Sequence, residues 1–274
     1  MKTRVFGVVL AVCLATAGAV VAQQRWGGRL YRAPPRFPAA DSFDGSFNFC
    51  RGMFTSVRGE AGGQGWWTDY PDADINFSIR LSELTKTPVS RARGDEPNHL
   101  VVRLLDDELF QCPYLHMEDV GTLSFSDDEV VRMREYLLKG GFLWVDDFWG
   151  TYAWEQWTSE IRRVLPPDEY PIHDLAKDHP FWRAMFQIEE LPQIPSINHW
   201  RRTGGETSER GYDSAQPNIR GISDAHGRLM VLMTHNTDIS DAWEREGEDP
   251  RYFYLFSPNG YAVGINVLMY AMTH

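Results

Sequence analysis

The chain has 274 residues, of which 43% are hydrophobic, 13% aromatic and 24% charged. These fractions are typical of a globular protein, and a mean hydropathy of −0.39 excludes a membrane protein with many spans. Because 38 acidic residues outnumber 27 basic ones, the net charge is −11, and binding to a nucleic-acid backbone is not expected.

The N-terminus has the pattern of a secretory signal peptide over residues 1–22. Lys2 and Arg4 precede an apolar run that ends at the small residue Ala22. We therefore predict cleavage after Ala22 and export to the periplasm or the cell exterior. Cleavage removes two positive charges and no negative ones, which changes the net charge from −11 to −13. The alternative is an uncleaved segment that tethers the protein to the membrane.

Residues 23–45 are polar and contain prolines, so we expect a leader that runs over the surface of a single α/β domain at residues 46–274. This domain holds two cysteines, Cys50 and Cys112. In an oxidising compartment they can pair, and otherwise they are buried thiols; the sequence leaves both possibilities open. Neither follows the end of an expected strand, so we predict that neither is a nucleophile.

Strand and helix patterns alternate through the domain. Short apolar runs predict strands at residues 47–54, 100–105, 112–117, 142–145, 218–222 and 228–233. The spacing of apolar residues predicts helices at residues 75–84, 130–138, 154–164 and 261–272, with Ser126 and Glu129 as a capping box before the second. Residues 166–218 are expected to be irregular. This alternation predicts a doubly wound, mostly parallel sheet with helices on both faces.

Ligands bind to an open parallel sheet where loops leave the carboxyl ends of its strands. Four loops in that position carry polar or aromatic side chains, at residues 65–70, 116–119, 146–150 and 234–238. We expect these loops to converge on one rim and to form a binding or catalytic site.

Acidic side chains and a histidine are the candidate catalytic residues on this rim. Asp146 and Asp147 follow a strand, and two adjacent carboxylates are costly there unless one is protonated, metal-bound or paired with a cation. The alternative is that one caps a helix while the other is solvated. His235 with Asp238 resembles a base with its orienting carboxylate, or two metal ligands. The alternative is that Asn236 and Asp238 only shape their loop.

Aromatic residues of the same loops are candidates for a stacking platform under a sugar or an aromatic ligand. They are Trp66, Trp67, Tyr70 and Trp149. The alternative is that they belong to the hydrophobic core. Asp69, His116 and Asn236 are the further candidate ligand contacts.

Common catalytic motifs are missing from the sequence. It contains no phosphate-binding P-loop, no GxGxxG after a strand, no HExxH and no GxSxG. Nucleotide-dependent chemistry and serine hydrolysis therefore lack their usual markers.

Several motifs resemble those of the "domain of unknown function 4159" family. They are residues 66–71 (WWTDYP), 76–77 (NF), 80–81 (RL), 140–147 (GGFLWVDD), 178–180 (DHP), 234–238 (THNTD) and 264–266 (GIN). The resemblance covers about residues 45–274. It implies a flavodoxin-like fold similar to class I glutamine amidotransferases, in a family without an established reaction. It also implies a cell-envelope setting, because members are often encoded near membrane-anchored von Willebrand-type proteins.

The amidotransferase comparison bears on the candidate site. The position of the nucleophilic cysteine corresponds to Asp146 and Asp147, and the position of the catalytic histidine and acid corresponds to residues 235–238. Since a carboxylate cannot replace the thiolate in acyl transfer from glutamine, amidotransferase activity is not expected. Residues 178–191 are similar to the trehalose-utilisation branch of the fold, which implies a sugar ligand.

Three functions remain open. The leading hypothesis is a non-enzymatic binding module for a small polar or carbohydrate-like ligand or an envelope protein partner, with no membrane span after signal cleavage. The main alternative is a hydrolase that uses Asp146 or Asp147 with His235 and Asp238, either around a metal or as an acid and base pair. The third is a structural partner in an envelope complex. The sequence identifies neither a cofactor nor a metal.

Overall fold

The computed structural model describes residues 33–39, 41–92 and 94–274, and the expected signal peptide lies outside the described residues. Residues 36–274 form one compact unit. In the described ranges, no helix has the length and apolar character that crossing a membrane requires.

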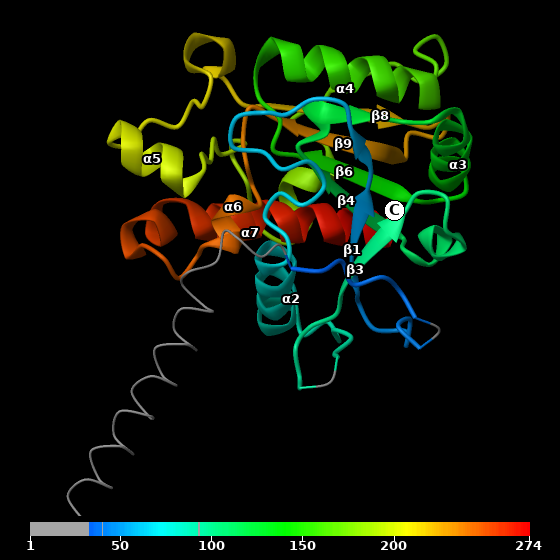
Figure 1. The fold of residues 1–274 in the computed structure, drawn as a ribbon, viewed down its shortest axis with the longest axis horizontal. Coiled ribbons are helices and arrows are strands. Elements are labelled where there is room, and N and C mark those ends of the chain that lie inside the picture. The colour runs from blue at the N-terminus through cyan, green and yellow to red at the C-terminus, as the bar shows by residue number, and fades with distance from the viewer. Residues whose placement is uncertain (1–32, 40, 93) are drawn as a thin grey trace, which may run out of the picture. The chain divides into compact units, whose positions relative to one another are not determined.

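A seven-stranded sheet is the centre of this unit (Figure 1). Its order is β3-β1-β4-β6-β9-β8-β7. The five parallel strands are β1 (Phe49–Met53), β3 (His99–Arg103), β4 (Tyr114–Glu118), β6 (Phe142–Asp146) and β9 (Leu229–His235). Renumbered in chain order, they follow the flavodoxin-like order 2-1-3-4-5, which confirms the doubly wound fold.

The far edge of the sheet is antiparallel. β8 (Asn218–Ser223) pairs antiparallel with β9, and β7 (His173–Asp174) pairs antiparallel with β8. Residues 224–228 join β8 to β9 in a hairpin, because two strands connected by so short a turn cannot run parallel. β2 (Thr55–Ser56) and β5 (Leu123–Ser124) form a separate two-stranded sheet.

Helices cover both faces of the sheet. The described α-helices are α2 (Asp72–Thr85), α3 (Asp127–Leu138), α4 (Gly150–Val164), α5 (Ile197–Thr203), α6 (Asp241–Glu244) and α7 (Pro250–Thr273). Short 3-10 helices are η1 (Asp107–Gln111), η2 (Val120–Thr122), η3 (Pro180–Arg183) and η4 (Gly211–Ser214). α2, α6 and α7 pack together on one side, while α3 and α4 contact each other on the other (Figure 1).

The main hydrophobic core lies between the sheet and the α2 and α7 side. Phe49 and Trp144 point from the strands into this core, where they meet Phe77 of α2, Trp243 of α6 and Val267 of α7. All five side chains are fully buried. Burial of this much aromatic and aliphatic surface fixes the position of α6, which carries part of the candidate site.

Most element predictions are confirmed, with two differences. The expected capping box of Ser126 and Glu129 is present at the start of α3. The last helix begins at Pro250 rather than Tyr261, because Asp249 accepts a hydrogen bond from the amide of Arg251 and proline is favoured in a first turn. The region expected to be irregular contains β7, α5 and two 3-10 turns.

The two cysteines form a disulfide. Cys50 in β1 pairs with Cys112, which lies just before β4 and is 62 positions away in sequence. Both residues are buried. The alternative of two buried thiols is thus excluded, and the bond ties together the amino-terminal ends of two neighbouring strands.

The last part of the expected leader joins the edge of the sheet. The carbonyl of Arg36 accepts a hydrogen bond from the amide of Val101 in β3. The amide of Arg36 donates to the hydroxyl of Tyr70 at 3.0 Å. These bonds connect residue 36 with β3 and with the loop that precedes α2.

Candidate functional site

The four predicted loops meet at the carboxyl edge of the parallel strands. The amide of Gly65 donates to Asp119 Oδ2 at 2.7 Å, and the amide of Asp119 donates to the carbonyl of Asp147 at 3.1 Å. The amide of Asn236 donates to the carbonyl of Phe148 at 3.0 Å. These bonds connect the loops to one another, so segments far apart in sequence form one rim.

The rim coincides with the topological switch point of the sheet. β1 and β4 are neighbours there, but only one pair of residues, Arg51 and His116, is in register between them. Connections from these two strands leave in opposite directions, which opens the crevice where doubly wound proteins bind ligands. The position of the candidate site therefore follows from the fold.

Left-handed backbone recurs on the rim. Asp69 has a φ of 60°, Asp119 of 52°, Asp147 of 49° and Asn236 of 63°. Asp and Asn tolerate this conformation better than other non-glycine residues, but it still costs free energy. Four such residues at one edge of a sheet mark sharp turns that orient the side chains of the rim.

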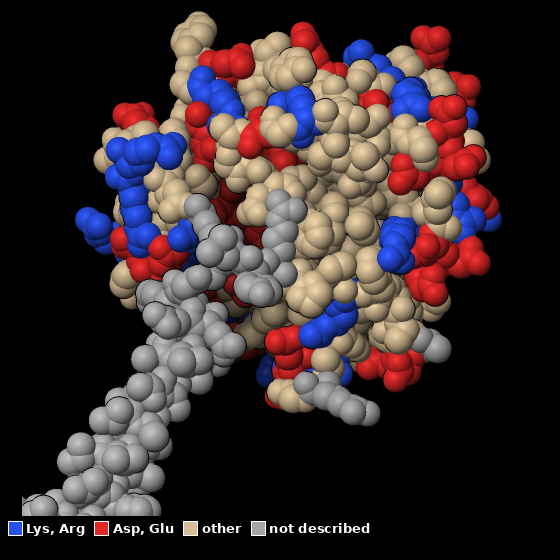
Figure 2. Space-filling model, viewed as in Figure 1, with Lys and Arg blue, Asp and Glu red and all other residues tan. Residues whose placement is uncertain are grey.

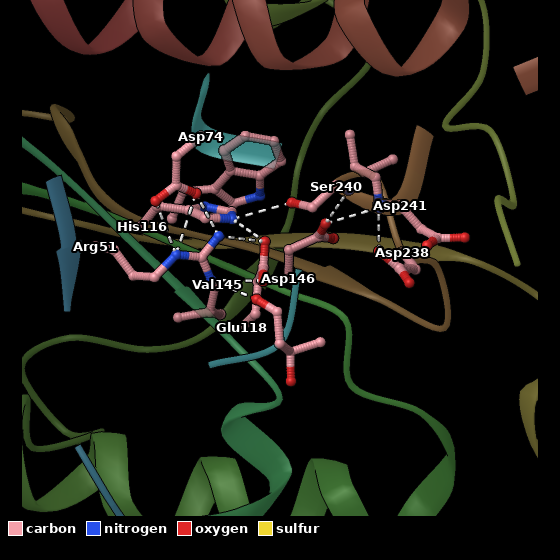
Figure 3. A network of polar contacts seen from close by, with 12 residues as sticks. Arg51, Asp74, His116, Glu118, Val145, Asp146, Asp238, Ser240 and Asp241 are labelled. Atoms are coloured by element: carbon pink, nitrogen blue, oxygen red, sulfur yellow. Dashed lines mark hydrogen bonds and ion pairs between the residues drawn. The ribbon is translucent and has the colours of Figure 1, made fainter. Parts of the chain in front are cut away.

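Arg51 is at the centre of a fully buried network under the rim (Figure 3). Its Nη2 lies 2.5 Å from Asp74 Oδ1, and its Nη1 lies 2.6 Å from Glu118 Oε2. Nη1 also donates to the carbonyl of Thr68 at 2.8 Å, which fixes the 65–70 loop. Burial alone would raise the pKa of Glu118, but the charge of Arg51 and the hydrogen bond of His116 lower it to about 2. Arg51 therefore keeps Glu118 ionised in the interior.

His116 belongs to the same network and is fully buried. Its Nε2 lies 2.9 Å from Glu118 Oε1 and 3.1 Å from Ser240 Oγ (Figure 3). The imidazole thus links β4 to the residues that precede α6. The structure encloses this candidate ligand contact beneath the rim.

Asp146 and Asp147 have different surroundings although they are adjacent. Asp146 accepts hydrogen bonds from Thr234 Oγ1 at 2.5 Å and from the amides of Ile239 at 2.7 Å and Ser240 at 3.2 Å (Figure 3). It is fully buried, and burial raises its pKa to about 8 despite these donors. Asp146 therefore holds the segment that enters α6.

Asp147 lies in the sharp turn after β6. Its Oδ1 accepts a hydrogen bond from Trp149 Nε1 at 2.8 Å, and 9% of the residue is exposed. Burial and the negative charges of Glu209 and Asp119 raise its pKa well above the ordinary range of a carboxyl group. Asp147 is thus the member of the pair that stands on the rim itself.

Asp147 is one of five carboxylates that we name the acidic cluster: Asp69, Asp147, Asp238, Asp241 and Glu244. Burial is the largest cause of a raised pKa at each of the five. Nearby negative charge adds to it, as Asp147 does for Asp238 and Asp241 does for Glu244. Figure 2 shows acidic side chains deep in a hollow of this face, near the place of α6 in Figure 1.

Positive charge is scarce around the acidic cluster. Within the described ranges, no lysine, arginine or histidine forms a salt bridge with Asp69, Asp147, Asp238 or Asp241, and Glu244 has Arg245 at 4.0 Å. Buried carboxylates without a cation are costly, so they bind protons or attract a ligand that supplies positive charge or hydrogen-bond donors.

Two members of the acidic cluster were not predicted from the sequence. Asp241 and Glu244 lie in the four-residue helix α6, which is too short for a periodic pattern. Asp241 Oδ2 accepts hydrogen bonds from the amide of Ile197 at 2.6 Å and from the hydroxyl of Tyr252 at 3.0 Å. One oxygen each of Asp69, Asp241 and Glu244 lie within 4.8 Å of one another, a spacing that suits a metal ion.

His235 has its contacts away from the acidic cluster. Its Nε2 lies 3.1 Å from the carbonyl of Gly150, and its ring packs against Phe148 and Trp154 with centroids 4.8 and 5.2 Å away. Burial lowers its pKa to about 4. Since Thr234 contacts Asp146, strand alternation turns the next side chain to the other face of the sheet. His235 is therefore not brought into hydrogen-bond contact with Asp146 or Asp147.

The aromatic candidates surround the rim in different ways. Trp66 stacks on Trp67 with ring centroids 4.0 Å apart, and Trp67 is the more exposed of the two. Trp149 is buried and bound to Asp147, while Tyr70 is buried with its hydroxyl bound to Arg36.

The side chain of Asn236 shapes its loop. Its Oδ1 accepts a hydrogen bond from the amide of Gly150 at 2.8 Å, and its Nδ2 donates to the carbonyl of Gln216 at 2.9 Å. Both bonds connect the residue to the backbone of neighbouring segments.

The fold and the rim define a doubly wound α/β protein with an acidic cluster at the carboxyl edge of its sheet. The chain belongs to the family described as "domain of unknown function (DUF4159)", whose match extends over residues 54–272. No curated protein matches the sequence.

Proposed function

We propose that this chain is an exported binding protein that takes a small polar ligand at the acidic cluster. The observation that carries this proposal is the acidic cluster at the switch point of the sheet, in which Asp147, Asp238 and Asp241 are buried and form no salt bridge with another described residue. Such carboxylates accept hydrogen bonds from hydroxyl and ammonium groups, which are the donors of a carbohydrate-like or amine ligand.

The Trp66 and Trp67 stack supports the same class of ligand. An aromatic face beside carboxylates offers an apolar surface and hydrogen-bond acceptors together, the combination that a sugar ring needs. Trp67 and Asp69 lie in one loop, whose position Arg51 fixes through the carbonyl of Thr68.

Binding is tested by calorimetry with a panel of sugars, polyols and amines. At least one member is expected to bind the wild-type protein. Asp147→Asn is expected to weaken that binding at least tenfold, which corresponds to about 1.4 kcal/mol. Asp128→Asn, an exposed substitution at the start of α3, is the control and is expected to leave binding unchanged. Binding of a protein partner alone, with no response to the panel, would contradict the proposal.

Export is supported by the signal-like N-terminus and by the Cys50–Cys112 disulfide, since such bonds persist in oxidising compartments. Mass spectrometry of the protein from the native cell is expected to find Gln23 as the first residue. Retention of Met1 would support the membrane-tethered alternative.

A hydrolase is the second candidate, and the sharp turn at Asp147 favours it. This residue follows a strand and precedes α4, so the turn presents a carboxylate as strand–turn–helix elbows present nucleophiles. The negative charge of Asp147 raises the pKa of Asp238, so a pair that holds one proton offers a donor for a leaving group and a base that activates water. Turnover of chromogenic glycosides or esters that Asp147→Asn abolishes would favour this function over simple binding.

A further inference from the structure

We propose that Asp69, Asp241 and Glu244 form a binding site for a divalent cation that prefers oxygen ligands, such as Ca²⁺, Mg²⁺ or Mn²⁺. This inference deepens the proposed function, because the cation would lie in the hollow assigned to the polar ligand. The inference depends on contacts other than those that support the polar ligand, and it is tested with the metal alone.

The geometry is the first argument. Asp69 comes from the loop after β1 and the other two residues from α6, yet one oxygen of each lies within 4.8 Å of the others. Hydrogen bonds from neighbouring residues fix the positions of Asp69 and Asp241. Arg51 binds the carbonyl of Thr68 next to Asp69, and Ile197 and Tyr252 bind Oδ2 of Asp241. Three carboxylates held this close repel one another unless a cation or protons lie between them.

An orphaned oxygen is the second and independent argument. Asp69 Oδ2 is shielded from solvent and has no hydrogen-bond partner among the described residues. Buried carboxylate oxygens in proteins are almost always bound to a donor or a metal. The left-handed backbone of Asp69, with a φ of 60°, orients the carboxylate that bears this oxygen toward Asp241 and Glu244.

The chemistry of the donors selects the type of cation. All three ligands are carboxylates, and hard cations such as Ca²⁺, Mg²⁺ and Mn²⁺ prefer oxygen. Neither cysteine nor histidine belongs to the set, which disfavours Zn²⁺ and copper. Three protein ligands leave coordination positions for water or for the hydroxyl groups of a bound polyol.

The exported protein provides the test, with Tb³⁺ as a luminescent probe for Ca²⁺. Excitation of Trp66 and Trp67, which are in the same loop as Asp69, is expected to sensitise Tb³⁺ emission, and Ca²⁺, Mg²⁺ or Mn²⁺ is expected to displace the probe. Calorimetry is expected to give one ion per chain.

Two substitutions check the ligands. Asp69→Asn keeps the left-handed backbone, since Asn tolerates it, and Glu244→Gln changes a half-buried side chain. Each is expected to lower metal affinity by about tenfold or more. Asp128→Asn is expected to leave it unchanged, and circular dichroism confirms that each variant folds. Failure of the wild-type protein to bind any of the cations, or unchanged affinity in folded Asp69→Asn, would overturn the inference.

The result is distinguishable from that of the ligand panel. Metal binding without any response to sugars, polyols or amines leaves the cation site standing and contradicts the proposed function. Ligand binding that persists in a chelator, together with no metal binding, leaves the proposed function standing and contradicts the cation site.

Discussion

Two groups of carboxylates lie side by side at the carboxyl edge of the sheet, and they differ in whether a cation accompanies them. Asp74 and Glu118 share the guanidinium of Arg51, which is fully buried between them. The acidic cluster has no such partner in the described part of the chain, apart from Arg245 at 4.0 Å from Glu244. The first group has the features of a structural support, whereas the raised pKa values of the second are typical of carboxylates that bind protons or a ligand.

The largest expected loss of stability follows from removal of the Arg51 guanidinium, the cation that compensates Asp74 and Glu118. Arg51→Met leaves Asp74 and Glu118 buried without a partner, and we expect the free energy of unfolding to fall by about 3–5 kcal/mol. Urea denaturation measures the change. Arg91→Met, which removes an exposed ion pair with Asp95, is the control and is expected to cost less than about 1 kcal/mol. A loss of similar size in both variants would remove the distinction between the two groups.

Two further buried carboxylates beside these groups, Asp119 and Asp146, make the stability of the fold depend on pH. Burial raises the pKa of Asp119 to about 7 and that of Asp146 to about 8, so the folded state binds these protons more tightly than the unfolded state. The stability they contribute is complete below their ordinary pKa and is lost as pH rises through the raised values.

We therefore expect the free energy of unfolding to fall between about pH 5 and about pH 8, by up to about 1.4 kcal/mol per pH unit for each such proton. Asp119→Asn can keep the hydrogen bond from Gly65 and is expected to flatten the curve below about pH 7. Urea denaturation across this range measures it, and an unaltered slope in the variant would contradict the assignment.

The smallest expected change in the free energy of unfolding comes from replacing an aspartate of the acidic cluster by asparagine. The same substitution beside Arg51 is expected to have the opposite sign. Asp238→Asn removes a buried charge but can retain the hydrogen bond from the amide of Asp241, so we expect the ligand-free protein to gain about 1 kcal/mol at pH 8. Asp74→Asn takes a carboxylate away from Arg51 and is expected to destabilise the protein. Thermal and chemical denaturation of both variants measure the contrast, and destabilisation by both would refute it.

The rim could be predicted from the sequence because the carboxyl ends of parallel strands lie at one edge of a sheet, which brings the four loops together. The sequence also identified Asp69, Asp147 and Asp238, which follow strands or lie in the predicted loops. It could not separate Asp146 from Asp147, because the direction of each side chain depends on where the strand ends and the turn begins. The position of His235 depends on the same alternation, which assigns it to the face opposite Thr234.

Arg51 is a residue whose pairing the sequence indicates. An arginine in the middle of an apolar strand has to be paired when both faces of that strand are covered. Its partners, Asp74 in α2 and Glu118 in β4, come from other elements, and only the three-dimensional structure brings them together.

The left-handed turns of the rim also bear on how such a site can diversify. Asp69, Asp119 and Asp147 need residues that accept positive φ, which in practice means Asp, Asn or Gly. Aspartate codons become asparagine or glycine codons by a single nucleotide change. A point mutation can therefore alter the charge of the rim while the backbone keeps its shape.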